Sequence, residues 1–127
     1  MTDFEKQREW QRIEVESFRI SLCLSGNDAV NAVIDDLSAG GIRISCDRIT
    51  AHKIQHEYDS TREKKSTRFP VNFILPMDNG QDNIEAVCRM IYIIKQAHDN
   101  YAVGLEFADI DDKTRKTLMA YVEDQDE

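Results

Sequence analysis

The feature that most constrains the fold is a strict alternation of apolar and polar residues early in the chain. The apolar members are Phe18, Ile20, Leu22 and Leu24, and the residues between them are Arg19, Ser21 and Cys23. A period of two places every second side chain on the same face of an extended segment. This stretch therefore predicts a β-strand with one face in the core, beginning near Val15.

Five further short segments have the composition of strands and are separated by turn residues. They cover residues 29–36, 42–46, 71–75, 84–94 and 101–107, with turns at 25–28, 37–41, 78–80 and 98–100. Asparagine, aspartate, glycine and serine dominate these turns, as is typical of hairpin connections. The pattern predicts a mainly β protein whose strands form a small antiparallel barrel over residues 15–108.

The period changes after Phe107, where the apolar residues follow a helical repeat. Together with Thr114, the apolar residues Ile110, Leu118, Tyr121 and Val122 fall on one face, and the acids Asp109, Asp111 and Asp112 lie at the helix start. Acidic residues at a helix start cap free N–H groups and complement the helix dipole. We therefore expect a C-terminal α-helix over 109–124, which closes a single domain of residues 1–127.

Two polar segments lack the alternation of apolar and polar residues that is typical of the strands. Residues 1–14 are charged and poor in apolar anchors, so we expect a flexible N-terminal arm. Residues 47–68 are longer than a hairpin loop and read as a solvated loop, a short helix or a docking surface. Of these we expect a mobile surface excursion.

The charge of the chain limits the partners it can bind. Aspartate and glutamate number 24 against 16 lysines and arginines, for a formal net charge of −8. A protein that coats a nucleic-acid polymer needs a basic face, so DNA and RNA are not expected partners. An anionic ligand would have to be small and held by a local group of arginines.

The apolar runs and the cysteines of the chain indicate its cellular compartment. The longest apolar run, residues 90–94, is far shorter than a membrane span, and the first ten residues carry no secretory signal. We expect a cytoplasmic protein without membrane insertion. Cys23, Cys46 and Cys88 are odd in number and widely spaced, so we expect buried or half-buried thiols instead of disulfides or a zinc site.

Catalytic and metal sites lack a convincing set of residues. His52 and His56 are four apart and could share a helix face, but only Glu57 offers a third ligand, so no metal is expected. A small hydrolase or nuclease would need acids or histidines gathered in a cleft. We expect no catalytic residues, no cofactor and no enzymatic activity.

Two short motifs carry the functional signal. The first is Arg8-x-x-x-Arg12, just before the first strand, and the second is Asp36-x-Ser38-x-x-Gly41, between the second and third. In this order and at these places the chain resembles the PilZ domain family, whose members bind cyclic di-GMP. Residues 85–89, 101–107 and the final helix are also similar to that family.

This resemblance implies a six-stranded antiparallel β-barrel with a C-terminal helix and a flexible N-terminal arm. It also implies a cyclic di-GMP receptor or adaptor that changes conformation or binds a downstream protein partner when the nucleotide binds. The alternative is a PilZ-like protein-interaction module with a weak or vestigial nucleotide site. Gln7, where many members have a third arginine, and residues 47–68 favour that alternative.

The motif residues suit the ligand chemically. The guanidinium groups of Arg8 and Arg12 can fork onto phosphate oxygens or guanine O6 and N7, and can stack on flat bases. Asp36 can accept from the donor edge of guanine, and the Ser38 hydroxyl can bridge ligand and turn backbone. Gly41 would permit a positive φ or a close approach to the ligand. Additional candidates are Gln7, Gly40 and Arg89.

Overall fold

The computed structural model describes residues 19–25, 28–60, 67–77 and 80–126. Its strands are β1 (Arg19–Cys23), β2 (Ala29–Leu37), β3 (Gly41–Cys46), β4 (Phe69–Met77), β5 (Gly80–Ala97) and β6 (Asn100–Asp109). Its helices are α2 (Arg48–Ser60) and α3 (Asp112–Asp126). All six predicted strands are confirmed, and β5 extends beyond its predicted ends on both sides. The predicted start of the first strand near Val15 lies outside the described residues.

The six strands form a closed barrel in the order β1-β2-β3-β6-β5-β4. Every neighbouring pair is antiparallel, and closure is made by β1 and β4, where Ile20 lies opposite Phe73. The expected six-stranded antiparallel barrel with a C-terminal helix is therefore confirmed.

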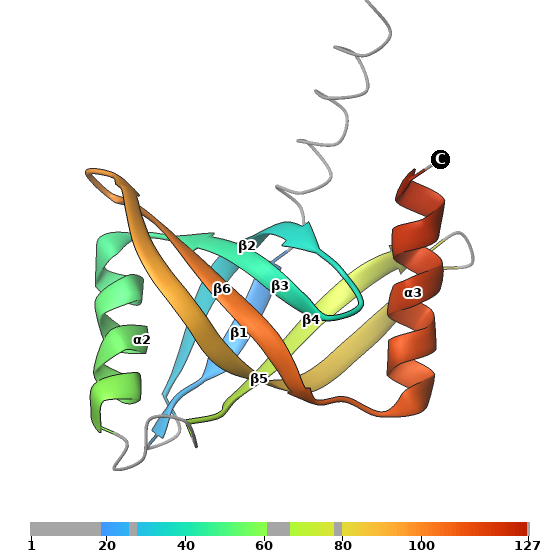
Figure 1. Ribbon diagram of the computed structural model, residues 1–127, viewed down its shortest axis with the longest axis horizontal. Coiled ribbons are helices and arrows are strands. Elements are labelled where there is room, and N and C mark those ends of the chain that lie inside the picture. Colours follow the sequence, from blue (N-terminus) through green and yellow to red (C-terminus); the bar gives the residue numbers. More distant parts are fainter. Residues whose placement is uncertain (1–18, 26–27, 61–66, 78–79, 127) are drawn as a thin grey trace, which may run out of the picture.

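Alternating side chains fill the interior, and the two helices cover opposite ends of the barrel (Figure 1). Ile54 of α2 and Leu118 of α3 are fully buried in the same apolar core as the strand residues. The other largest fully buried side chains are Phe69, Ile20, Leu22, Ile34, Ile44, Leu75, Val103 and Cys88. Burial of these side chains supplies most of the driving force for folding.

For residues 48–60, helix α2 corrects the expectation of a mobile surface excursion at 47–68; residues 61–66 lie outside the described residues. Its start is capped by Asp47, whose Oδ1 accepts a hydrogen bond from Thr50 N at 2.7 Å. Ala51 and Ile54, three residues apart on one face, are completely buried. Two apolar positions on one face suffice to anchor a short polar helix when a barrel end is available to pack against.

Helix α3 begins three residues later than predicted. Asp109 ends β6, and Asp111 accepts a hydrogen bond from Thr114 N at 2.7 Å, so Asp111 caps the helix. In the part of the chain that the structure describes, no helix is long and apolar enough to span a membrane.

The cysteines occupy three different environments, and the expectation of buried or half-buried thiols is wrong for Cys23. Cys23 is exposed because it lies on the outward face of β1, whereas Cys46 is half-buried and Cys88 is buried. Burial raises the pKa of the Cys88 thiol to about 12. Desolvation, with the charge of Asp47, raises the pKa of Cys46 to about 11.

Candidate functional site

The β2–β3 turn is organised by the side chain of Ser38. Its Oγ accepts hydrogen bonds from the backbone N–H groups of Gly40 and Gly41, both at 3.2 Å, and donates to the carbonyl of Gly41 at 3.3 Å. The backbone N of Ser38 also donates to that carbonyl at 2.9 Å. These local bonds hold the turn in one conformation without help from distant residues.

Gly41 is required by close packing against β6. A Cβ at this position would lie 2.3 Å from the carbonyl oxygen of Leu105 and 3.2 Å from the Cα of Glu106. Its φ is outside the left-handed region, so a close approach to the neighbouring strand, and not a positive φ, explains the glycine. Gly40 is different, because its nearest neighbour would be Ser38 Oγ at 3.9 Å.

A β-bulge brings Asp36 to the outer surface. The β2–β3 register shifts between Ile34 and Asp36, which leaves Asp35 without an opposite residue. Simple alternation after buried Ile34 would turn Asp36 inward, whereas with the bulge both Asp35 and Asp36 are exposed. The Asp35 carboxylate accepts a hydrogen bond from the hydroxyl of Ser45, and Asp36 lies opposite Arg43.

Four of the predicted residues line one shallow depression of about 280 Å³ on the outer face of the barrel, namely Asp36, Ser38, Gly40 and Gly41. The remaining walls come from β3, β5 and β6. The residues there are Ile42, Arg43, Ile91, Tyr92, Gly104, Leu105 and Glu106. Sequence reasoning missed this second group because only the pairing of β3 with β6 and β5 brings it to the motif.

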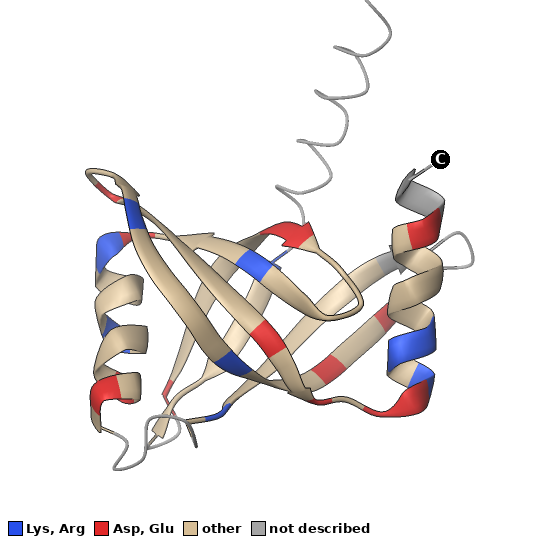
Figure 2. Ribbon diagram, in the orientation of Figure 1, with Lys and Arg blue, Asp and Glu red and all other residues tan. Residues whose placement is uncertain are grey.

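Basic and acidic residues alternate across the strands on this side of the barrel (Figure 2). Arg43 is exposed beside Asp36, and Glu106 forms an ion pair with Arg89. The structure therefore places the Arg89 guanidinium against Glu106, at the edge of the depression. Arg8, Arg12 and Gln7 lie outside the described residues, as does the predicted arm of residues 1–14.

A sequence profile of the PilZ domain matches residues 6–124 of this chain. The chain belongs to the PilZ domain family. No curated protein sequence matches it.

Solved structures with the same fold share little sequence with this PilZ domain. The inhibitor of motility MotI/DgrA of Bacillus subtilis matches with a TM-score of 0.65 and 14% identity, over 86% of this chain and 46% of that one. The PilZ domain of Escherichia coli YcgR, solved with c-di-GMP, matches with a TM-score of 0.52 and 14% identity, over 86% of this chain and 81% of the other.

Borreliella burgdorferi PlzA, solved in complex with c-di-GMP, matches with a TM-score of 0.54 and 8% identity. That match covers 94% of this chain and 55% of PlzA. The PilZ domain described here therefore spans about half the length of MotI/DgrA and PlzA.

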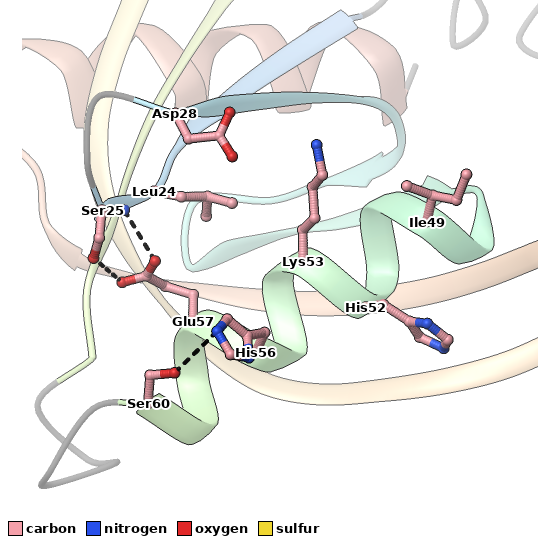
Figure 3. Close-up of a pocket in the computed structure, with 9 residues that line it drawn as sticks. All are labelled: Leu24, Ser25, Asp28, Ile49, His52, Lys53, His56, Glu57 and Ser60. Atoms are coloured by element: carbon pink, nitrogen blue, oxygen red, sulfur yellow. Dashed lines mark hydrogen bonds between the residues drawn. The ribbon is translucent and has the colours of Figure 1, made fainter.

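A second hollow of about 650 Å³ lies between α2 and the β1–β2 connection of this PilZ domain (Figure 3). Here Glu57 accepts two hydrogen bonds from Ser25, at 2.9 Å from the backbone N and 2.5 Å from Oγ. These bonds, the hydroxyl first and then the backbone, lower the pKa of Glu57.

His52 and His56 line this hollow on the same helix. His56 Nε2 lies 3.5 Å from the Ser60 hydroxyl, and the His52 ring meets Tyr101 edge-on with centroids 6.2 Å apart. Among the described residues, no group of three or more His, Cys, Asp or Glu side chains could hold a metal ion.

Proposed function

We propose that this PilZ domain is a receptor for cyclic di-GMP, which it binds on the outer face of the barrel at the β2–β3 turn. The observation that carries the proposal is the meeting of Asp36, Ser38, Gly40 and Gly41 in one surface depression. The family match and the ligand in the YcgR and PlzA structures support the same ligand here.

The proposed ligand carries two phosphates and two guanines, so its site needs both concentrated positive charge and flat surfaces. We assign Arg8 and Arg12 to the phosphates and guanine faces. The chain has a formal net charge of −8, so attraction must come from such local arginines and not from the field of the whole protein.

Asp36 and Ser38 have different proposed tasks. The exposed carboxylate of Asp36 accepts hydrogen bonds from the N1–H and exocyclic amine of a guanine. The Ser38 hydroxyl already bonds the turn backbone, so it keeps Asp36 and Gly40 in position for the ligand. Gly41 lets the turn lie against β6.

We further propose that the domain acts as an adaptor and not as an enzyme. The nucleotide remains intact, and its binding changes the conformation of the domain or its affinity for a downstream protein. Intact cyclic di-GMP after long incubation with the protein is the expected result.

The deciding experiment is calorimetric titration of the purified full chain with cyclic di-GMP. We expect saturating heat with the wild type and binding weaker by about ten- to a hundredfold in Arg12→Ala, because a charged hydrogen-bonding partner is removed. Arg115→Ala, which removes an exposed arginine from α3, is the matched control and should bind normally.

The opposite outcome is also informative. No heat from the wild type, together with a melting temperature that the nucleotide does not shift, would overturn the receptor proposal. It would leave the alternative of a PilZ-type interaction module whose nucleotide site is vestigial.

A further inference from the structure

Four residues form one row across the outer face of the barrel. Asp36 on β2 lies opposite Arg43 on β3, Arg43 lies opposite Gly104 on β6, and Gly104 lies opposite Tyr92 on β5. Directly opposed residues in antiparallel strands present their side chains on the same face. The row therefore places an acid, a cation, a glycine and an aromatic residue side by side.

The aromatic end of the row depends on a second β-bulge. The β5–β6 register shifts between Met90 and Tyr92, so that Tyr92 and not Ile91 lies opposite Gly104. Both Ile91 and Tyr92 consequently point outward and line the depression. This bulge and the one at Asp35 flank the same hollow.

The Tyr92 ring lies with its face on Gly104. A Cβ at residue 104 would be 2.2 Å from Cε2 and 2.6 Å from each of its two ring neighbours, Cδ2 and Cζ. A position beneath the ring face gives this nearly even set of distances, whereas an approach at the ring edge would leave both neighbours much farther away. One face of the ring is therefore covered by β6, and the side chain remains 36% exposed.

Arg43 stands across Gly104 from this ring. Since glycine contributes no side chain, nothing in the row separates the guanidinium from the aromatic ring. Within the described parts of the chain, Arg43 has no ion-pair partner, whereas Arg89 is bound to Glu106. An exposed arginine in this position can direct its planar donors toward a ligand in the depression.

We infer that Tyr92 and Arg43 bind one guanine base of the ligand between them. The base stacks on the outer face of the Tyr92 ring, with its O6 and N7 acceptors toward the Arg43 guanidinium. The inference rests on the proposed function and assigns two ligand-binding residues outside the Arg8/Arg12 and Asp36/Ser38/Gly41 motifs. The packing of the ring itself accounts for glycine at residue 104, because a Cβ there would collide with the ring.

Four variants of the full chain test the stacking role by titration with cyclic di-GMP. Tyr92→Ala and Tyr92→Leu should bind about tenfold more weakly, because neither keeps a flat ring. Tyr92→Phe should bind like the wild type, because the ring is retained. Ile94→Ala is the matched control, since Ile94 is an exposed apolar residue of β5 outside the depression.

The leucine variant separates stacking from folding, because leucine still covers Gly104 and should leave the melting temperature unchanged. Stacking also has a spectroscopic readout. The guanine H8 proton should move upfield on binding to the wild type and to Tyr92→Phe, and this shift should be absent with Tyr92→Leu.

The role of Arg43 is tested by comparing cyclic di-GMP with cyclic di-AMP, because adenine replaces the O6 acceptor by an amino group. Arg43→Ala should weaken cyclic di-GMP binding about tenfold and reduce the preference over cyclic di-AMP, and Arg43→Lys should not restore it. Wild-type affinity in Tyr92→Leu and Arg43→Ala, with the wild type binding well, overturns this inference and leaves the proposed function intact. A wild type that does not bind overturns both.

Discussion

Arg89 and Glu106 form a forked ion pair between neighbouring strands at the edge of the depression. Nη2 and Nε of Arg89 lie 2.7 and 3.1 Å from the same carboxylate oxygen, Oε1 of Glu106. Glu106 on β6 lines the depression and lies between Arg89 on β5 and Gly41 on β3. The pair therefore places one negative charge at the proposed site and holds one positive charge beside it.

Neutralising Glu106 should strengthen ligand binding. Glu106→Gln removes a negative charge from the depression in which the anionic ligand is proposed to bind, and it releases Arg89. The side chains of Arg89 and Glu106 are 46% and 48% exposed. Because exposed pairs are weak, we expect an affinity gain of about two- to fivefold, larger at low salt. Calorimetry at two ionic strengths measures the gain. Glu123→Gln on α3 is the control, and equal affinities for the two variants would contradict this prediction.

The two glycines of the turn should differ sharply in their tolerance of a methyl group. Gly41→Ala places a Cβ 2.3 Å from the Leu105 carbonyl, so the β3–β6 pairing must shift. We expect a loss of about 1–3 kcal/mol and a melting temperature lower by about 5 °C or more. Gly40→Ala meets only Ser38 Oγ at 3.9 Å and should melt like the wild type. Equal melting temperatures for the two variants would contradict the close packing of Gly41.

Helix α2 should behave as part of the core and not as a surface excursion. Ile54 is 0% exposed, so Ile54→Ala should cost about 2–5 kcal/mol in urea unfolding. Ile49 on the same helix is 66% exposed, and Ile49→Ala should change the free energy of unfolding by less than about 0.5 kcal/mol. A small effect at both positions would show that the helix does not cover the barrel in solution.

The three thiols should react in a fixed order with an alkylating reagent at about pH 8, because the thiolate is the reactive form. Cys23 is exposed and should react first. Burial raises the pKa of Cys46 to about 11 and that of Cys88 to about 12, so both carry little thiolate at this pH. Mass spectrometry should show slow labelling of Cys46, slower labelling of Cys88, and rapid labelling of all three in urea. Fast labelling of Cys88 in the native protein would contradict its burial.

The contact between Ser25 and Glu57 should make stability depend on pH. The Ser25 hydroxyl and backbone N–H lower the pKa of Glu57, so the contact stabilises the fold when Glu57 is ionised. This contribution is complete above the unfolded-state pKa and is lost as the pH falls through the lower folded-state value. Ser25→Ala should therefore melt below the wild type at neutral pH, and the difference should narrow below about pH 4. A difference that is constant with pH would exclude the carboxylate as the source.

The strands and the turn were predictable because their signals are local. Alternation near Ile20 and Leu22 specifies a strand face, and both side chains are buried as expected. The Ser38 hydroxyl bonds backbone groups two and three residues away, so the conformation of the turn is encoded within the motif itself. The cap of α3 at Asp111 is local in the same sense, since its partner is three residues later.

The helix at 48–60, unlike the strands and the turn, was not predictable from local signals. Most of its residues are polar, and its apolar face consists chiefly of Ala51 and Ile54. Such a segment is marginal as a helix in water and is stabilised by packing. Its anchor is an open barrel end, which exists only after strands distant in the sequence have paired.

The two sides of the candidate site also differ in how far the sequence predicts them, because one is local and the other depends on strand pairing. Residues 36–41 carry the acid, the hydroxyl and the glycines in one short stretch, and their nature is evident from the sequence. The row of Asp36, Arg43, Gly104 and Tyr92 depends on the pairing of β2, β3, β6 and β5 and on two bulges that shift register. A shift of one residue turns every following side chain to the opposite face of a strand, and the local pattern does not specify where such shifts occur.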